Sequence, residues 1–430
     1  MFVMPENEPF ILIISGVRGD TRRYRAFHLY EQTHLLGLDS QLSHITDSEI
    51  RNKAIRADVV ILHRAPFDRQ IAQLEREIHR KGGLLIQDID DLLFEPEAFK
   101  YIQSVDFSDP VRASLYQEEM RLYRKTVEAC DAVIASTGYL AERIRLLGKP
   151  VRIHRNAFSR EMLECSNMAY QTRQTSDRGI VIGYASGTAT HDQDFALIKP
   201  ALKSILNRFP TTELWLVGPV DPGTDWGDLA SQIHRRKLVP WRNLPDVLVR
   251  FDINLAPLRT DNPFGQSKSE IKYVEAALVK VPTIASPTDA FKHAIRQADN
   301  GFLASDTLQW ENYLETLILQ PELRRLVGED AYQDVMQRYH PDMRARELEG
   351  TLSAWMGREL NLPPATSVAS KPEAGLVDPF WSCTKAEQSP SLLQMGWHTL
   401  RYRGLFVLLK QVWIFLRRWV SPLIPFRRID

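Results

Sequence analysis

Residues 262–286 contain the closest grouping of side chains that could bind a phosphorylated ligand. A loop carries Lys268, and the helix predicted after it places Lys272 and Glu275 three residues apart on one face. Two ammonium groups can bind a diphosphate, and a carboxylate one turn further on can accept hydrogen bonds from two ribose hydroxyls. The alternative is a solvated helix face with a surface ion pair, and the neighbouring strands favour the binding site.

The elements around this segment follow a definite order. In chain order they are a strand that ends in Gly-Pro, a second strand, a short apolar strand and a further helix, at residues 214–219, 252–258, 281–286 and from 310 onward. This order resembles the C-terminal domain of the group 1 (family 4-type) glycosyltransferases of the GT-B fold, over about residues 180–345. The resemblance implies that Lys272 and Glu275 bind the diphosphate and the ribose of a nucleotide-sugar donor.

One position departs from the pattern of that family. Many members carry a glutamate eight residues before the ribose-binding glutamate, where it contacts the sugar or assists at the reacting carbon, and here that position is Ser267. Lys268 and Glu270 follow it. The nucleotide-binding half of the motif is therefore present, whereas the first carboxylate of the sugar-recognition half is missing.

Length and charge set bounds on the whole chain. At 430 residues it is long enough for two domains and an additional segment, and its 44% of apolar residues can form two cores. The formal net charge is zero, but residues 390–430 hold seven Lys or Arg and one Asp, which leaves six excess acids on the body. A slightly acidic body with a basic tail argues against nucleic acid and favours an anionic membrane surface as partner.

Cysteine usage and hydropathy indicate the compartment. The three cysteines, Cys130, Cys165 and Cys383, have no pairing pattern and no metal-ligand spacing, which is typical of a reducing compartment. The N-terminus lacks the basic region and cleavage site of a signal peptide, and no uncharged stretch approaches the roughly 18–20 residues of a spanning helix. We therefore expect a cytoplasmic protein that associates peripherally with the inner face of the membrane.

Apolar runs alternate with helical patterns over the first 157 residues. Four runs have the near-continuous apolar character of parallel strands covered on both faces, at residues 10–14, 59–62, 84–87 and 132–135. Residues 151–156 predict a last strand. Strands that alternate with helices imply right-handed crossovers and a doubly wound α/β domain.

The same alternation resumes at residue 179, so we predict two Rossmann-like domains that face a cleft. A polar linker would join them, and the family resemblance implies a helix that crosses back onto the first domain. A stretch rich in Pro, Ser, Ala and Glu predicts a flexible linker before the tail. The predicted ranges are 1–157 and 179–345 for the two domains, 158–178 for the interdomain linker, 346–360 for the returning helix, 361–394 for the flexible linker and 395–430 for the tail.

Residues 395–420 regain helical periodicity and predict an amphipathic helix. Its apolar face comprises Leu405, Leu408, Val412, Phe415, Leu416 and Trp419, and its cationic face comprises Arg403, Lys410 and Arg417. A helix with aromatic residues and a cationic face is typical of peptides that lie in a bilayer interface. Packing on the body or against a second copy is the alternative.

The segment Asp88-Ile-Asp-Asp-Leu-Leu-Phe follows a predicted strand of the first domain. An Asp-x-Asp pair, here Asp88 and Asp90, binds manganese in the other glycosyltransferase fold, but the second domain argues against that fold. Open α/β sheets place their sites at the carboxyl ends of the strands, and the segment recurs in relatives of this group. The resemblance therefore implies that Asp90 and Asp91 face the cleft, and helix capping by either residue is the alternative.

Two further candidates end strands of the first domain. The loop Gly16-Val-Arg18-Gly follows the first strand, and its glycines would allow a ligand close to the backbone while the next helix offers its N-terminus to phosphate. An exposed basic loop is the alternative. His63 ends the strand at residues 59–62, where relatives often carry a histidine, and a purely structural role is the alternative.

The segment 184–192 opens the second domain after its first strand. Its small and hydroxyl-bearing residues, with a helix after them, suit phosphate or sugar contacts. In the family the corresponding loop faces the donor. The resemblance therefore makes Gly187, Thr188 and His191 candidates for donor binding.

Together with the resemblance, these observations predict a GT-B glycosyltransferase that uses a nucleotide-diphosphate sugar, retains anomeric configuration and needs no metal or other cofactor. The expected acceptor is a glycan or a lipid-linked molecule in cell-surface polysaccharide synthesis. Cationic groups would stabilise the departing diphosphate. The candidates for the reaction are Lys272, Lys268, Asp91 and His63, and those for donor binding are Glu275, Lys272, Lys268, Ser267, Gly187, Thr188, His191, Gly16 and Arg18.

Two other functions are compatible with the same residues. A sugar-nucleotide 2-epimerase of the same fold would need neither a membrane-binding tail nor an open acceptor cleft. A catalytically inactive, sugar-nucleotide-binding scaffold of a glycan-assembly complex is supported by the serine at position 267. Release of the nucleoside diphosphate without any acceptor would eliminate the scaffold.

Overall fold

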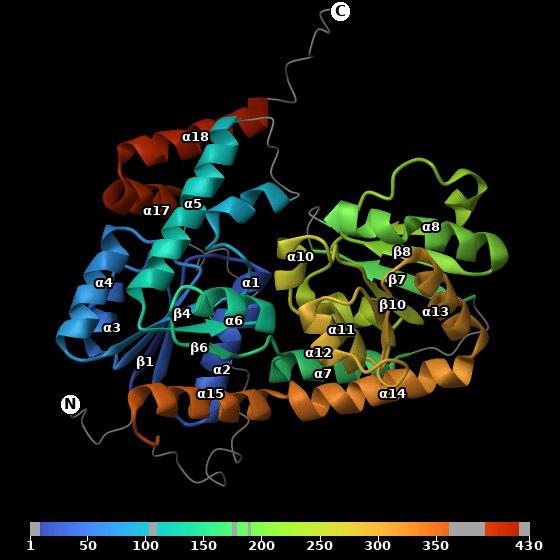
Figure 1. Cartoon of the computed structure of the whole chain (residues 1–430), viewed down its shortest axis with the longest axis horizontal. Helices are drawn as coiled ribbons and strands as arrows, with labels where there is room; N and C mark the ends of the chain where they lie inside the picture. The colour runs from blue at the N-terminus through green and yellow to red at the C-terminus, as the bar shows by residue number, and fades with distance from the viewer. Residues whose placement is uncertain (1–8, 103–109, 174–178, 188–190, 361–391, 421–430) are drawn as a thin grey trace, which may run out of the picture.

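The computed structural model describes residues 9–102, 110–173, 179–187, 191–360 and 392–420 (Figure 1). Two α/β domains lie side by side, each built on its own parallel sheet. A long helical segment, α14 (Pro321–Arg338) and α15 (Pro341–Met356), runs along one edge of both domains, and the last helices lie at the opposite end of the first domain (Figure 1). The predicted two-domain α/β architecture is confirmed.

The first domain contains a six-stranded parallel sheet in the order β2-β1-β3-β4-β5-β6. Its strands are β1 (Ile11–Ser15), β2 (Ser40–His44), β3 (Val59–His63), β4 (Leu84–Ile89), β5 (Ala132–Ala135) and β6 (Val151–Ile153). Strands β1 and β3 are buried along their whole length, as their apolar sequences predict. The polar strand β2 was not predicted, and it lies at the edge of the sheet, where only one neighbour constrains it.

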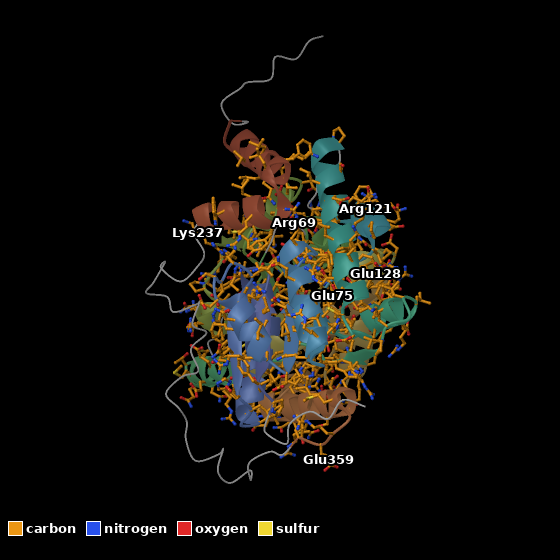
Figure 2. All side chains as sticks on the ribbon, turned by 90° about the vertical axis from the view of Figure 1, so that its left-hand side faces the viewer. Arg69, Glu75, Arg121, Glu128, Lys237 and Glu359 are labelled. Carbon is orange, nitrogen blue, oxygen red and sulfur yellow. The ribbon has the colours of Figure 1, made fainter. Side chains whose placement is uncertain are left out.

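Helices cover both faces of this sheet. They are α1 (Asp20–Arg22), α2 (His28–Leu35), α3 (Ile50–Arg56), α4 (Arg69–Arg80), α5 (Pro110–Ala129) and α6 (Gly138–Arg145), with a π-helical turn (Arg23–Phe27) between α1 and α2. Side-chain caps begin two of them: Asp68 accepts from the backbone N–H of Gln70 at α4, and Thr137 accepts from Leu140 at α6. Helices α4 and α5 form the outer surface of the domain (Figure 2).

The second domain repeats the plan with the strand order β12-β11-β10-β7-β8-β9. Its strands are β7 (Val181–Ala185), β8 (Glu213–Val217), β9 (Ile233–Arg236), β10 (Ile253–Ala256), β11 (Thr283–Ala285) and β12 (Phe302–Leu303). Its helices are α8 (Asp192–Arg208), α9 (Leu244–Leu248), α10 (Pro263–Ser267), α11 (Ile271–Leu278), α12 (Asp289–Ala294), α13 (Thr307–Leu319) and α14 (Pro321–Arg338). The predicted strands at 214–217 and 252–258 correspond to β8 and β10.

The connections between the domains differ in part from the prediction. Within the predicted linker 158–178, helix α7 (Arg160–Gln171) begins at the cap residue Ser159, and its Met162 packs in a core cluster of the second domain. The returning helix is α15 (Pro341–Met356), which begins before the predicted residue 346. Its Leu348 and Leu352 pack in the core beneath β1 and β3, as the resemblance implied.

The tail forms a hairpin of helices rather than the single predicted helix. Helix α17 (Leu392–His398) and a π-helical turn (Thr399–Arg403) end at Gly404, whose φ of 93° breaks the helix before α18 (Leu405–Val420). This C-terminal hairpin, residues 392–420, contacts the first domain through His398, which lies 2.6 Å from the side-chain oxygen of Gln70. Most of the predicted flexible linker, residues 361–391, lies outside the described residues.

Candidate functional site

A cleft of about 660 Å³ lies between the two domains, at the carboxyl ends of their central strands. The first domain contributes the loop after β1 and the ends of β3 and β4. The second domain contributes the loop after β7, residues 238–244 and the segment from α10 to α11. The principal polar residues of the lining are Arg18, Arg23, Tyr24, Arg64, Asp90, Asp91, His191, Lys268, Lys272 and Glu275.

Helix α11 presents Lys272 and Glu275 to this cleft from one face, as their spacing predicts. The ammonium group of Lys272 donates to the carbonyl oxygen of Ala185 at the end of β7 and lies 5.1 Å from the centroid of the Tyr184 ring. Burial lowers the pKa of Lys272 and raises the pKa of Glu275. A lysine and a carboxylate thus lie one turn apart in a partly enclosed, polar site.

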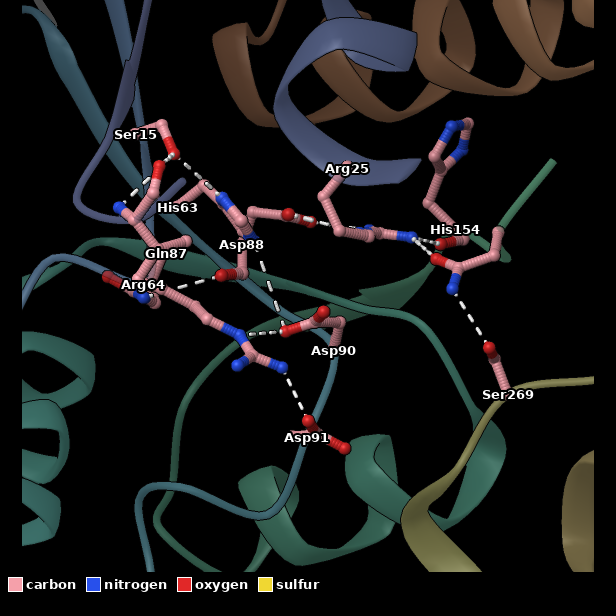
Figure 3. Close-up of polar contacts among 12 residues, drawn as sticks. Ser15, Arg25, His63, Arg64, Gln87, Asp88, Asp90, Asp91, His154 and Ser269 are labelled. Carbon is pink, nitrogen blue, oxygen red and sulfur yellow. Dashed lines mark hydrogen bonds and ion pairs between the residues drawn. The ribbon is translucent and has the colours of Figure 1, made fainter. Parts of the chain in front are cut away.

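Lys268 connects the two domains across the cleft. Its Nζ lies 2.7 Å from Oδ1 of Asp91, whose other carboxylate oxygen accepts from Arg64. Arg64 also donates from Nε to Asp90 over 2.6 Å (Figure 3). Burial alone would raise the pKa of Asp91, but Lys268 and Arg64 outweigh it and hold that pKa below the ordinary value. Asp91 is therefore an ionised carboxylate in the cleft, as its candidate role requires.

Asp88 is part of a buried ion pair and does not line the cleft. Arg25 donates to both oxygens of Asp88, from Nε over 3.0 Å, and also to the carbonyl oxygen of His154 and the side chain of Asn156 (Figure 3). Both members of the Asp-x-Asp pattern, Asp88 and Asp90, therefore have guanidinium partners. Within the described residues, no group of three His, Cys, Asp or Glu side chains is arranged to hold a metal ion.

His63 and Gly16 lie behind the wall of the cleft. His63 is fully buried, with Nδ1 3.2 Å from the Ser15 hydroxyl and Nε2 3.9 Å from Asp90 (Figure 3). Burial lowers the pKa of His63 to about 3, so the ring is neutral. A Cβ atom on Gly16 would lie 2.2 Å from the carbonyl oxygen of Arg64, so this glycine permits close packing of two backbone segments. The structure does not bring either residue into contact with the cleft.

The remaining candidates have three different outcomes. Arg18, Gly187 and His191 line the cleft, and Nδ1 of His191 lies 2.8 Å from Asp194, while burial lowers the pKa of this histidine. Ser267 is fully buried, where its hydroxyl donates to the carbonyl oxygen of Phe264 over 2.8 Å, and it does not reach the cleft. Thr188 lies outside the described residues.

Tyr24, Arg23 and Trp241 also line the cleft, although they were not among the candidate site residues. The hydroxyl of Tyr24 donates to Oε1 of Glu275 in the other domain. The guanidinium of Arg23 lies 3.9 Å from the centroid of the Tyr24 ring and 4.6 Å from that of Trp241. The run of arginines at 18–25 indicated a cationic loop, but no local pattern indicates contacts with partners so far along the chain.

The first domain also contacts the segment that precedes α11, residues 262–269. Asn262 donates to the carbonyl oxygen of Tyr101 over 3.0 Å, and the ring of Phe264 packs in a core cluster of the first domain. The side chain of Asn156 donates to Ser269 over 2.8 Å. The position of Lys268 therefore depends on contacts with both domains.

Comparison with known proteins confirms this architecture. The sequence model of a family described as "Glycosyl transferase-like" matches residues 197–350. The HepE protein of Anabaena, solved in complex with UDP, superposes with a TM-score of 0.56 at 14% identity, over 80% of this chain and 99% of that one. No curated protein sequence matches the chain.

Two further solved structures share the fold. The sucrose-phosphate synthase of Thermosynechococcus elongatus superposes with a TM-score of 0.55 at 13% identity, over 81% of this chain and 99% of that one. A glycosyltransferase of Rickettsia africae gives 0.53 at 14% identity, over 81% and 99%. The predicted resemblance is thus confirmed: the chain has the GT-B fold, and its second domain carries a glycosyl transferase-like sequence.

Proposed function

We propose that this protein transfers a sugar from a nucleotide-diphosphate sugar to a glycan or lipid-linked acceptor in cell-surface polysaccharide synthesis. The observation that supports it most directly is the placement of Lys272 and Glu275, one turn apart in the cleft, with Lys268 nearby on the preceding loop. Uridine diphosphate is the first nucleotide to test, because the HepE protein of Anabaena was solved with UDP and with UDP-glucose.

In the proposed reaction, the bond between the anomeric carbon and the β-phosphate oxygen breaks while the acceptor oxygen bonds to the same carbon, with retention of configuration. The acceptor proton passes to the departing phosphate. Lys268, Lys272 and Arg18 would stabilise the negative charge that develops on the diphosphate. Asp91 would accept a hydrogen bond from an acceptor or sugar hydroxyl, because its neighbours keep it ionised.

The experiment combines binding with turnover on the full-length protein. A ligand at about 100 times its dissociation constant stabilises the native state by roughly 2.7 kcal/mol, so thermal shift with UDP, GDP and ADP identifies the nucleotide. Release of the nucleoside diphosphate from the matching nucleotide sugars then tests for an enzyme. Binding without release, with or without glycan acceptors, would favour the inactive scaffold over the transferase.

We also propose that the C-terminal hairpin binds an anionic bilayer at the inner face of the membrane. Trp397, Leu405 and Phe406 are 66%, 58% and 70% exposed, and Leu409 and Val412 are exposed beside them. Arg401 and Lys410 supply cations on the same hairpin, whereas Arg403 is paired with Glu119 of α5. Within the described residues, no helix is sufficiently long and apolar to cross a membrane, so the proposed association is with the surface.

A further inference from the structure

Glu275, the residue assigned to the ribose, has a hydrogen-bond donor from the first domain. The hydroxyl of Tyr24 donates to its Oε1 atom across the cleft. A phenol hydroxyl and a ribose hydroxyl offer a carboxylate the same kind of donor. In this state the protein itself therefore supplies one of the contacts that a bound nucleoside would make.

Arg23 holds Tyr24 in this position. Arg23 is 2% exposed, and its guanidinium lies 3.9 Å from the ring centroid of Tyr24 and 4.6 Å from that of Trp241. Nη1 of Arg23 also lies 3.9 Å from the sulfur of Met162. Two consecutive residues of the first domain thus reach three side chains that pack with the second: Glu275, Trp241 and Met162.

The backbone that carries this pair has an unusual conformation. Residues Arg23–Phe27 form a π-helical turn between α1 and α2. Such turns insert an extra residue into a helix and occur frequently at functional sites. The turn follows α1, the three-residue helix after the loop that leaves β1, so Tyr24 lies on a segment outside the sheet.

We propose that Tyr24 competes with the ribose of the donor for Glu275, so that donor binding must displace it. This inference rests on the proposed function, because it assigns Glu275 to a nucleoside. The two oxygens of a carboxylate can accept about four hydrogen bonds in all, so the competition is for space. The Tyr24 hydroxyl is bonded to Oε1, and its phenol ring therefore lies where a ribose would have to approach this oxygen. The contact also joins the two domains. A donor that displaces Tyr24 would therefore remove one hydrogen bond between them.

The competition should raise the apparent dissociation constant of the donor nucleotide. When only a fraction of the molecules has Glu275 available, the apparent dissociation constant is the intrinsic one divided by that fraction. Removal of a hydrogen bond to a charged group alters an equilibrium by roughly 10- to 100-fold. Tyr24→Phe keeps the ring that stacks on Arg23 and removes only the competing hydroxyl.

The test is calorimetric titration of the full-length wild type, Tyr24→Phe and Tyr313→Phe with UDP. Tyr313 lies on α13, outside the cleft lining, and its ring packs on Phe302, so its variant controls for the loss of a tyrosine hydroxyl. We expect Tyr24→Phe to bind UDP at least about 10-fold more tightly than the wild type and Tyr313→Phe to match the wild type. Unchanged or weaker binding by Tyr24→Phe would overturn the proposal, and weaker binding would make Tyr24 a donor contact.

Hydrogen exchange on the wild type gives a second readout that needs no substitution. Amides of residues 20–28 should exchange faster with saturating UDP than without it, because the nucleotide displaces Tyr24, and slower exchange would count against displacement. Failure of the proposed function is distinguishable: if neither the wild type nor Tyr24→Phe binds UDP, GDP or ADP, both proposals are overturned. Binding only by Tyr24→Phe supports competition directly.

Discussion

At the scale of single residues, each acidic side chain discussed in the cleft lies near one or more cationic side chains. Glu275 lies near Lys272 and Arg23, and these cations lower its pKa while burial, the larger effect, raises it. Asp91 has two cationic partners, Lys268 and Arg64. A nucleotide diphosphate would bring new negative charge to this arrangement, so the consequences of a substitution here are electrostatic as well as steric.

Glu275→Gln tests the ribose assignment. The substitution keeps the shape of the side chain but removes the charge, and hydrogen bonds to charged groups contribute roughly 1.5–3 kcal/mol. We expect affinity for UDP to fall about 10- to 100-fold in calorimetric titration. Glu329→Gln, which removes the partner of Lys280 on α14, is the matched control and should bind like the wild type. Equal affinity of Glu275→Gln and wild type would contradict the assignment.

Metal dependence is a second prediction at this scale. We expect nucleoside diphosphate release to continue in EDTA, because Lys268 and Lys272 lie in the cleft while Asp88 and Asp90 are paired with arginines. The measurement is the release rate before and after chelation, with and without added manganese. Loss of activity in EDTA and its recovery with manganese would show that the Asp-x-Asp pattern does hold a metal.

At the scale of elements, the start of α7 is linked to α2 through a buried carboxyl group. Glu31 of α2 is 6% exposed, and its Oε1 accepts from the backbone N–H of Arg160 over 2.9 Å. Burial raises the pKa of Glu31 to about 7, while the Arg160 contacts lower it and Asp342 and Glu161 raise it. This junction therefore titrates near neutral pH.

Glu31 should make the free energy of unfolding fall as the pH rises from about 4.5 to about 7. The native carboxyl keeps its proton up to about pH 7, whereas the unfolded one loses it near pH 4.5, so the native state binds more protons in between. Glu31→Gln imitates the protonated form and should stabilise the protein relative to the wild type at pH 8, by up to about 3 kcal/mol, with little effect at pH 4.5. Thermal shift of both proteins at the two pH values checks this, and a difference that does not depend on pH would contradict it.

At the scale of the whole molecule, charge is segregated between body and tail. Residues 390–430 carry the excess of cations, and the described part of the tail forms a hairpin against the first domain, beside α4 and α5 (Figures 1 and 2). Near an anionic bilayer, each Lys or Arg adds about 1 kcal/mol of attraction, and salt screens it. The exposed side chains of Leu405 and Phe406 would add apolar burial.

The membrane proposal predicts salt-sensitive binding that depends on the tail. In liposome flotation, the full-length protein should float with anionic vesicles at low salt, less at high salt, and little with zwitterionic vesicles. A protein that ends at residue 390 should stay in the soluble fraction and still bind UDP, because the two cores end before residue 361. Equal recovery of both proteins with anionic vesicles would instead make the hairpin a packing element.

Several features could be predicted from the sequence because their cause is local. The buried strands β1 and β3 are continuous apolar runs, which parallel strands covered on both faces require. The placement of Lys272 and Glu275 on one face follows from the helical period alone. Periodicity also indicated the apolar side of the tail, but it did not indicate that Gly404 would divide the helix, since a glycine within a helical pattern is tolerated in other contexts.

Only the tertiary structure decided which residues meet in the cleft. Tyr24 and Glu275 are 251 positions apart, and Lys268 and Asp91 are 177 apart, so no local pattern records either contact. His63 ends a strand as predicted but is buried, because the position of the neighbouring chain determines whether a strand end faces solvent. The sequence by itself determined the two domains and the helix that carries Lys272 and Glu275. Docking of one domain on the other determined the partners of that helix, because those contacts exist only after distant segments pack together.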